Sequence, residues 1–198
     1  MNKVNYQLEL DKIISRLEGR PSLLLHSCCG PCSSYVLEYL TQYFEVYLSY
    51  YNPNIQPRAE YELRLENQRK VLGHMPGVTL VECGYDGAAY EEAVRGLEGD
   101  PEGGARCTEC FRLRLDFAAR EAARLGCEYC CTTLTVSPHK DARRINALGE
   151  EICARYGVKW LPGDFKKRNG YKRSIELSHE FGLYRQDYCG CLYSKNQQ

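Results

Sequence analysis

The run Leu23-Leu24-Leu25-His26-Ser27-Cys28-Cys29-Gly30-Pro31-Cys32 joins an apolar strand to three closely spaced cysteines. A helical pattern of apolar residues begins directly after it, and Pro31 suits the first turn because its missing N–H group is not needed there. Free amide groups at a helix start also favour thiolates over thiols. Because open α/β sheets place their sites where strands end and helices begin, this run predicts a thiol site at such a junction.

The rest of the chain alternates between strand and helix patterns, which is typical of a parallel sheet covered on both faces. We therefore predict a single α/β domain over residues 1–198. Its expected fold is a Rossmann-like (HUP-like) parallel sheet flanked by helices, with a small helical or loop segment at the C-terminal end. Further strands are expected at 44–51, 78–83, 127–134 and 158–161, and further helices at 57–73, 86–94, 111–126, 141–156 and 175–181.

The charge balance argues against a general attraction to nucleic acid. Lysine and arginine total 26 and so do aspartate and glutamate, so a nucleic-acid partner would have to meet a local basic patch. The stretch 1–20 has an amphipathic helical rhythm and lacks the apolar core of a secretory signal. No apolar run approaches the length of a membrane span, so we expect a cytoplasmic protein without membrane contact.

Twelve cysteines are many for a cytoplasmic chain, where disulfides are rare and clustered thiols indicate metal binding or redox chemistry. Seven of them are grouped: Cys28, Cys29 and Cys32; Cys107 and Cys110; Cys189 and Cys191. The others lie inside apolar patterns, and we interpret them as small packing residues: Cys83, Cys127, Cys130, Cys131 and Cys153. Alternation along a strand would send Cys130 and Cys131 to opposite faces, which disfavours a shared metal.

Three kinds of chemistry are open to the grouped thiols. Cys29-Gly30-Pro31-Cys32 has the spacing of a thioredoxin-like dithiol site, although no tryptophan precedes it and the thiols after residue 100 would stay unused. Two Cys-x-x-Cys pairs could instead close a zinc site in a zinc-stabilised RNA-binding module. A [4Fe–4S] cluster takes four thiolates and would leave three for a further metal ion with an open coordination position. Spacing alone does not choose among them.

Five segments together resemble one known family. They are His26-Ser27-Cys28-Cys29-Gly30-Pro31-Cys32, Tyr51-Asn52-Pro53-Asn54-Ile55, Cys107-Thr108-Glu109-Cys110-Phe111-Arg112-Leu113-Arg114, Thr133-Leu134-Thr135-Val136-Ser137-Pro138-His139-Lys140 and Tyr184-Arg185-Gln186-Asp187-Tyr188-Cys189-Gly190-Cys191. Across residues 23–194 this pattern is similar to the epoxyqueuosine reductases of the QueH type. Some members of that family carry Asp at the position of Cys32, whereas Cys130 and Cys131 lie outside the pattern.

The resemblance implies an oxidoreductase that removes the epoxide oxygen of epoxyqueuosine at the wobble position of tRNA, giving queuosine without cobalamin. It implies a [4Fe–4S] cluster beside one additional metal ion, which we expect to be iron, and an external electron donor. The net reaction adds two electrons and two protons and releases water. No ATP is expected, because the phosphate-binding Ser-Gly-Gly pattern of ATP pyrophosphatases is missing.

Within this framework we assign the thiols to two centres. The cluster is expected to bind Cys29, Cys107, Cys110 and Cys189, and the second metal is expected to bind Cys28, Cys32 and Cys191. The Asp alternative in the family is the reason for placing residue 32 on the second metal. Candidate proton donors are His139, Tyr51, Asp141 and Asp187, while His26 is interpreted as structural.

RNA contacts are expected from basic residues with an interleaved tyrosine, since such residues suit phosphates and an unpaired base. The candidates are Lys166, Lys167, Arg168, Tyr171, Lys172 and Arg173, together with Lys140, Arg143 and Arg144. A solvated charged face is the alternative. The glycine-rich stretch 96–105 is predicted to be a flexible surface connection, with a lid over the site as its alternative.

Overall fold

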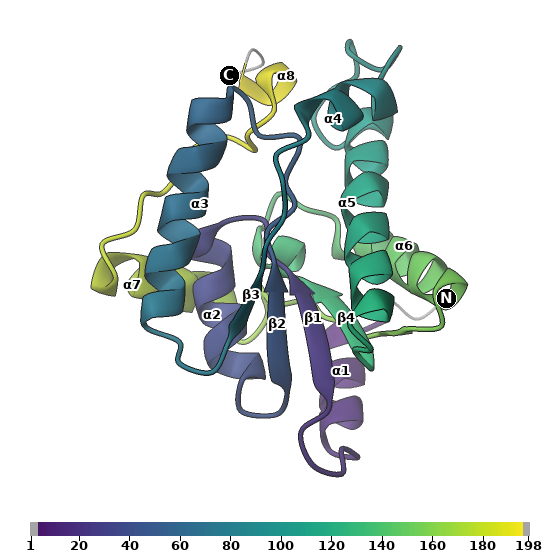
Figure 1. The fold of residues 1–198 in the computed structure, drawn as a ribbon, viewed down its shortest axis with the longest axis vertical. Coiled ribbons are helices and arrows are strands. Elements are labelled where there is room, and N and C mark those ends of the chain that lie inside the picture. The colour runs from purple at the N-terminus through teal and green to yellow at the C-terminus, as the bar shows by residue number, and fades with distance from the viewer. Residues whose placement is uncertain (1–3, 196–198) are drawn as a thin grey trace.

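A five-stranded parallel sheet forms the centre of the computed structural model, which describes residues 4–195 (Figure 1). The strands lie in the order β3-β2-β1-β4-β5, and each pairing between neighbours is parallel. Their bounds are Ser22–His26 for β1, Glu45–Ser49 for β2, Thr79–Val81 for β3, Tyr129–Thr132 for β4 and Lys159–Trp160 for β5. The predicted Rossmann-like parallel sheet is therefore confirmed.

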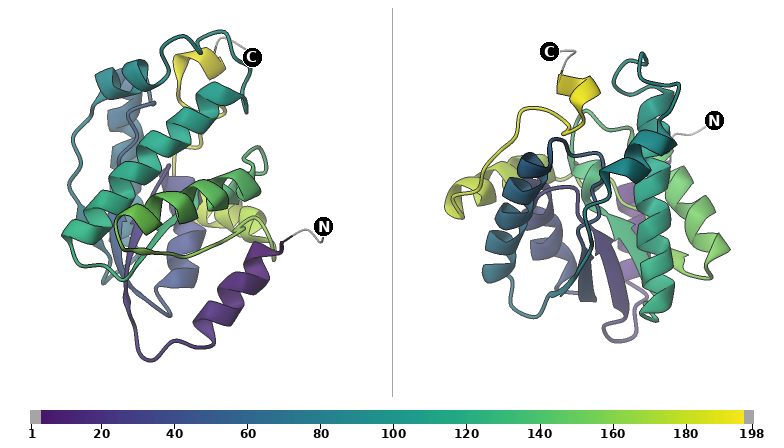
Figure 2. Two further views of the ribbon diagram at one scale, coloured as in Figure 1. Left: turned by 90° about the vertical axis from the view of Figure 1, so that its right-hand side faces the viewer. Right: turned by 45° about the horizontal axis from the view of Figure 1, so that its top comes forward.

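Helices cover both faces of the sheet, as Figures 1 and 2 show. The helices are α1 Tyr6–Ile14, α2 Gly30–Leu40, α3 Arg58–Gly73, α4 Gly87–Ala93, α5 Ala105–Arg124, α6 Ala142–Arg155, α7 Gly170–Glu180 and α8 Leu192–Lys195, with a 3₁₀ helix, η1, at Thr133–Val136. On one face α2 contacts both α3 and α7, and on the other face α5 contacts α6. This is the two-sided cover that a parallel sheet requires.

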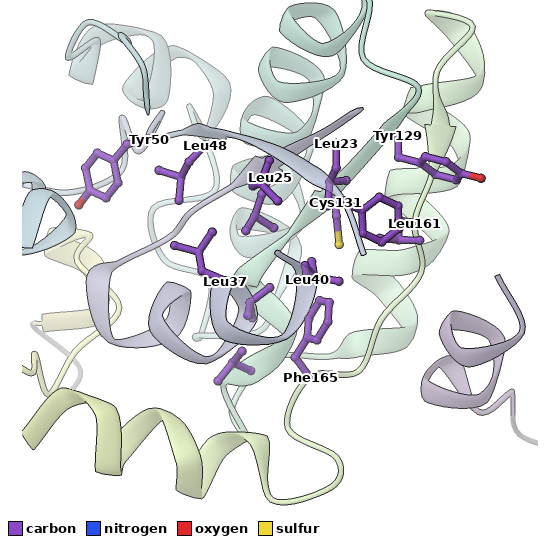
Figure 3. Packing of buried hydrophobic residues seen from close by; sticks show 14 of the residues in the cluster. Leu23, Leu25, Leu37, Leu40, Leu48, Tyr50, Tyr129, Cys131, Leu161 and Phe165 are labelled. Atoms are coloured by element: carbon purple, nitrogen blue, oxygen red, sulfur yellow. The ribbon is translucent and has the colours of Figure 1, made fainter. Parts of the chain in front are cut away.

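Strand β1 is buried on both sides because its side chains alternate between two cores. Leu23 and Leu25 pack into the core beneath α2 (Figure 3), and Leu24 packs into the core beneath α5 and α6. In the neighbouring strand β4, Cys131 belongs to the first core and Cys130 to the second. The prediction that these two cysteines point to opposite faces is confirmed.

Two helices begin earlier than predicted, and both differences bear on the site. Helix α5 begins at Ala105 rather than at residue 111, so its first turns contain the paired thiols of the middle segment. The Asp100 carboxylate accepts a hydrogen bond from the backbone N–H of Arg106, which stabilises this early start. Helix α7 begins at Gly170 rather than at 175. Only glycine fits at this first position, because a Cβ there would meet the Phe165 carbonyl oxygen at 2.0 Å.

The strand predicted over 127–134 is shorter, since β4 ends at Thr132 and η1 follows. The Thr132 hydroxyl accepts a hydrogen bond from the Leu134 backbone N–H, which turns the chain at this point. No helix within residues 4–195 combines the length and the apolar character that crossing a bilayer requires. The outermost residues of the predicted domain, 1–3 and 196–198, lie outside the described part of the chain.

Candidate functional site

The strand order reverses between β1 and β4, and the carboxyl ends of these two strands carry the first thiols of the site. Such a reversal opens a crevice at the sheet edge, where ligands bind in open α/β folds. Cys28 and Cys29 follow β1, and Cys32 lies in the first turn of α2. The three sulfur atoms lie within 4.8 Å of one another, a spacing that suits a single metal ion.

Close packing of α2 against α3 sets the position of these thiols. A Cβ on Gly30 would lie 3.0 Å from the backbone oxygen of Asn67, so glycine permits the close approach of the two helices. Gln68 accepts hydrogen bonds from the hydroxyls of Ser27 at 2.6 Å and Ser33 at 2.9 Å. The Cys29 sulfur caps α2 by accepting from the Cys32 backbone N–H at 3.4 Å, as the predicted helix start requires.

The three thiols differ in pKa, and Cys28 is the one that loses its proton most easily. Hydrogen bonding with Cys29 and Cys32 is the largest cause that lowers the pKa of Cys28 well below its usual value, and the Arg114 charge and the Thr133 hydroxyl add to it against burial. The same hydrogen bonding with Cys28 raises the pKa of Cys29 to about 12 and raises that of Cys32. The hydrogen bonds from the two neighbouring thiols therefore favour the thiolate form of Cys28.

Arg114 joins this group to the thiols of α5. Its guanidinium is 2% exposed, and Nη1 lies 3.9 Å from the Cys110 sulfur, one turn back on the same helix. Burial disfavours the charged form, but the charges of Cys110, Cys28 and Cys189 outweigh it and raise the pKa of Arg114. All three thiol segments therefore act on one buried cation.

His26 holds this cation in place from the sheet. Burial, reinforced by the Arg114 charge, lowers the pKa of His26 to about 3, so the imidazole is neutral. Arg114 Nε lies 3.4 Å from His26 Nε2, which also lies 3.2 Å from the Tyr51 backbone oxygen, and His26 Nδ1 shares a hydrogen bond of 2.8 Å with the Thr132 hydroxyl. Arg114 Nη2 donates to Asn52 Oδ1 at 2.5 Å. These contacts agree with the structural role that we expected for His26.

The C-terminal segment brings Cys189 and Cys191 to the same edge. Lys140 Nζ donates to the Cys189 sulfur at 3.2 Å, and Arg64 on α3 donates to the Cys189 carbonyl oxygen at the same distance. Cys191 accepts from the backbone N–H of Ser194 at 3.3 Å. It packs in a buried cluster with Cys110, and its pKa is raised by burial and by the Cys189 charge. The three segments thus converge at one end of the sheet.

A cavity of about 610 Å³ opens over these thiols. Its walls include Cys28, Cys29, Cys32 and Cys189, whereas Cys107 and Cys110 pack in the cores under α5 and α4. The volume is that of a site for a small ligand or a single nucleoside. Its remaining walls are Pro31, Glu102, Arg114, Leu134, Ser137, Pro138, His139, Lys140, Tyr171, Ser174, Arg185, Gln186, Asp187 and Tyr188.

Two of the four candidate proton donors line this cavity and two lie elsewhere. His139 and Asp187 are exposed at its wall. Asp141 caps α6, accepting from the backbone N–H groups of Arg143 and Arg144. Tyr51 is buried outside the wall, where its ring stacks on Phe117 with centroids 3.9 Å apart. Geometry therefore favours His139 and Asp187 over the other two.

The basic run expected to contact RNA is largely engaged in ion pairs within the chain. Lys166 pairs with Asp164, Arg168 pairs with Asp11 on α1, and Arg173 pairs with Glu38 on α2 at 2.7 Å. Tyr171 lines the cavity. From the second basic group, Lys140 points into the cavity, and Arg144 donates to the Gly103 backbone oxygen at 2.6 Å and to the Thr108 hydroxyl.

The glycine-rich stretch before α5 is anchored, which differs from the flexible connection that we expected. The buried guanidinium of Arg106 donates to the backbone oxygens of Leu97, Glu98 and Asp100. Glu102 pairs with Lys140 at 3.1 Å and forms part of the cavity wall. The stretch is therefore a fixed rim of the site.

Sequence reasoning missed several groups of this site. Arg114 follows Cys107 by seven positions and Cys110 by four, a spacing that places all three on one helix face and could have identified it. Lys140 was interpreted as an RNA contact, but burial turns it toward the thiols. Glu102 carries no sequence signal of its own, because its role depends on the folding of a long loop.

The fold and the site together define a class of protein: an α/β domain with a thiol-lined cavity at the edge of a parallel sheet. A family model described as epoxyqueuosine reductase QueH matches residues 23–197. Proteins named epoxyqueuosine reductase QueH are similar to this chain over most of their length. The one from Staphylococcus epidermidis is 43% identical, with 99% of this chain and 87% of the relative covered. The one from Streptococcus pyogenes is 42% identical, with 99% and 80% covered.

This chain belongs to the QueH family of epoxyqueuosine reductases. A QueH from Thermotoga maritima is 37% identical, with 87% of this chain and 90% of the relative covered. Among solved structures, the U34-tRNA thiolase NcsA from Methanococcus maripaludis with its [4Fe-4S] cluster has a similar fold. Its TM-score is 0.52 at 12% identity, with 96% of this chain and 67% of that chain covered.

Proposed function

We propose that this protein reduces the epoxide of epoxyqueuosine in tRNA to the alkene of queuosine, without cobalamin. The reaction breaks two carbon–oxygen bonds, takes up two electrons and two protons, and releases the oxygen as water. The observation that carries the proposal, in a member of the QueH family, is a cavity lined by thiols from two distant segments, Cys28, Cys29 and Cys32 from one and Cys189 from the other. We also propose a cytoplasmic location, since the proposed substrate is a tRNA.

The donor set fits a [4Fe–4S] cluster with one additional iron. Thiolates select soft metals and iron–sulfur clusters over magnesium or calcium, and the two buried cations Arg114 and Lys140 offset part of their negative charge. Within residues 4–195, the Tyr50 hydroxyl and Arg64 Nη2 are buried without hydrogen-bond partners, and both residues lie close enough to Cys29 for a thiolate there to act on them. Such donors suit the acceptor-rich surface of a cluster. The fold relative NcsA holds a cluster of this type.

We propose that Cys29, Cys107, Cys110 and Cys189 bind the cluster and that Cys28, Cys32 and Cys191 bind the second metal. Burial raises the pKa of Cys110 and the nearby Cys189 charge adds to this effect, and this proximity supports placing both thiols on one centre. Cys191 is the residue that tests this division of the thiols most directly, because it packs beside Cys110 rather than in the cavity wall. We expect Cys191→Ser to lose only the additional iron. We expect Cys189→Ser to lose the cluster. The reverse result would exchange the two assignments.

The bound centres would supply single electrons and a Lewis acid for the epoxide oxygen. The chain's own groups bind the substrate and handle protons. His139 and Asp187 line the cavity and are exposed, so that either can deliver a proton to the departing oxygen. Tyr171 and Tyr188 offer aromatic faces for an unpaired base, and Arg185 offers a cation for its phosphate. The electrons come from an external donor, and no ATP is required.

An anaerobic assay tests this function. The reconstituted protein is incubated with a chemical reductant and tRNA that contains epoxyqueuosine, and the nucleosides are then analysed by mass spectrometry. We expect loss of one oxygen atom from the modified nucleoside, together with iron and acid-labile sulfide in the purified protein. Cys32→Asp should keep the cluster absorbance. A colourless protein that reduces disulfides, or one that contains zinc alone, would contradict the proposal.

A further inference from the structure

Lys140 is a buried cation directly on a sulfur of the site. Its side chain is 10% exposed, its Nζ lies 3.2 Å from the Cys189 sulfur, and the same atom lies 5.9 Å from the centre of the Phe111 ring. Lys140 stands just before α6, in the segment that follows β4. A lysine that served only to attract RNA would keep its ammonium in solvent. Its contacts therefore indicate a role at the sulfur.

Glu102 is the counter-ion that holds this ammonium. Glu102 Oε1 accepts from Lys140 Nζ at 3.1 Å, and Glu102 Oε2 accepts from the Ser194 hydroxyl at 2.9 Å. The carboxylate lies on the loop that Arg106 anchors to α5. The ammonium is thus held between the Cys189 sulfur on the C-terminal segment and a carboxylate on a fixed rim.

A cation and an N–H donor at a ligand sulfur stabilise the more negative state of a metal centre. Hydrogen bonds to sulfur, net charge and solvent exposure are the factors by which proteins set iron–sulfur reduction potentials. Charges interact more strongly in a buried site than in water. The Lys140 ammonium should therefore favour the reduced state, and the Glu102 carboxylate should oppose it.

We propose that Lys140 raises the reduction potential of the centre that Cys189 ligates, and that the negative charge of Glu102 moderates its effect. Lys140 is a positioning residue here, since it acts through the sulfur. The inference rests on the proposed function, because it requires Cys189 to be a metal ligand. It extends that function by assigning control of electron acceptance to one ion pair.

Two substitutions that break the same ion pair distinguish this role from a structural one. Lys140→Gln removes the cation, whereas Glu102→Gln removes the anion and leaves the cation at the sulfur. Potentials are measured by anaerobic redox titration followed by electron paramagnetic resonance. We expect a shift to more negative potential in Lys140→Gln, a shift to more positive potential in Glu102→Gln, and a near wild-type value in Lys140→Arg.

Lys159→Gln is the matched control, because it breaks an exposed lysine–glutamate pair with Glu128 at 2.9 Å on β5. Its potential should equal that of the wild type. Shifts of the same sign in Lys140→Gln and Glu102→Gln, or no shift in either, would overturn the inference. If Lys140→Gln does not fold, the Glu102→Gln variant still tests the inference, because a shift to more negative potential or no shift would overturn it. Absence of any cluster signal in the reconstituted wild type would instead contradict the proposed function, and this inference with it.

Discussion

Thr133 and Cys28 exchange two hydrogen bonds across the point where the strand order reverses. The Cys28 backbone N–H donates to the Thr133 hydroxyl oxygen at 3.0 Å, and the hydroxyl donates to the Cys28 sulfur at 3.2 Å. The pair ties the end of β1 to the start of η1. It also helps to lower the pKa of Cys28, the thiol with the most stabilised charge.

Thr133→Val removes both hydrogen bonds while keeping the shape of the side chain. The orphaned amide should reduce the free energy of unfolding by about 1–3 kcal/mol. Loss of a partner behind a metal ligand commonly weakens metal binding by about 10–100-fold. Denaturant unfolding and anaerobic iron titration measure the two effects. Thr41→Val, which loses a hydroxyl bond to the Leu37 carbonyl at the end of α2, is the control and should leave iron binding unchanged.

Cys130→Ala and Cys131→Ala should keep the full iron content. Both thiols are buried in apolar cores, and hydrogen bonding with Cys153 raises the pKa of Cys130 while burial raises that of Cys131 to about 12. They are therefore neutral packing groups. Each substitution should lower the free energy of unfolding by about 1 kcal/mol, as for the loss of one buried methylene-sized group. Loss of iron from either variant would show that the packing interpretation is wrong.

Arg64→Met should destabilise the protein and loosen the C-terminal segment. Arg64 is 2% exposed, pairs with Glu60 at 2.7 Å and donates to the Cys189 carbonyl oxygen. Removing Arg64 leaves the partly buried Glu60 carboxylate without this partner. The loss of a charged hydrogen bond of this kind should lower the free energy of unfolding by about 2 kcal/mol. Denaturant unfolding measures the loss, and faster tryptic cleavage after Arg185 reports the loosened segment.

Arg58→Met is the control for that variant, because Arg58 pairs with Glu62 at 2.8 Å on the same helix but is 74% exposed. An exposed pair of this type contributes about 0.5 kcal/mol or less. Equal destabilisation by the two substitutions would contradict a special role for the buried pair.

Gly149→Ala should destabilise the packing of α6 on β5. The added Cβ would lie 2.3 Å from the indole ring of Trp160, whose Nε1 is held by Asn146 at 3.0 Å. Such overpacking costs about 1–3 kcal/mol. Gly73→Ala is the matched control, since nothing lies within 4 Å of its Cβ position at the end of α3, and it should be neutral or stabilising by about 0.5–1 kcal/mol. Thermal unfolding compares the two.

The sequence by itself determined the parallel α/β architecture and the thiols of the site. Apolar periodicity locates elements because burial depends on local spacing, so Leu23–Leu25 and the alternation of Cys130 and Cys131 were predictable. Local chemistry also placed Pro31 in the first turn of α2. The motif pattern indicated the QueH family, which the comparisons confirm.

Only the tertiary structure decided which charged groups contact the thiols. Lys140 points inward because Glu102 and Cys189, distant in sequence, surround its ammonium, and no local pattern encodes that contact. Tyr51 stacks on Phe117 rather than lining the cavity for the same reason. Side-chain direction at a site depends on which distant segments fold over it. That is a property of long-range packing, and the spacing of residues along one segment does not contain it.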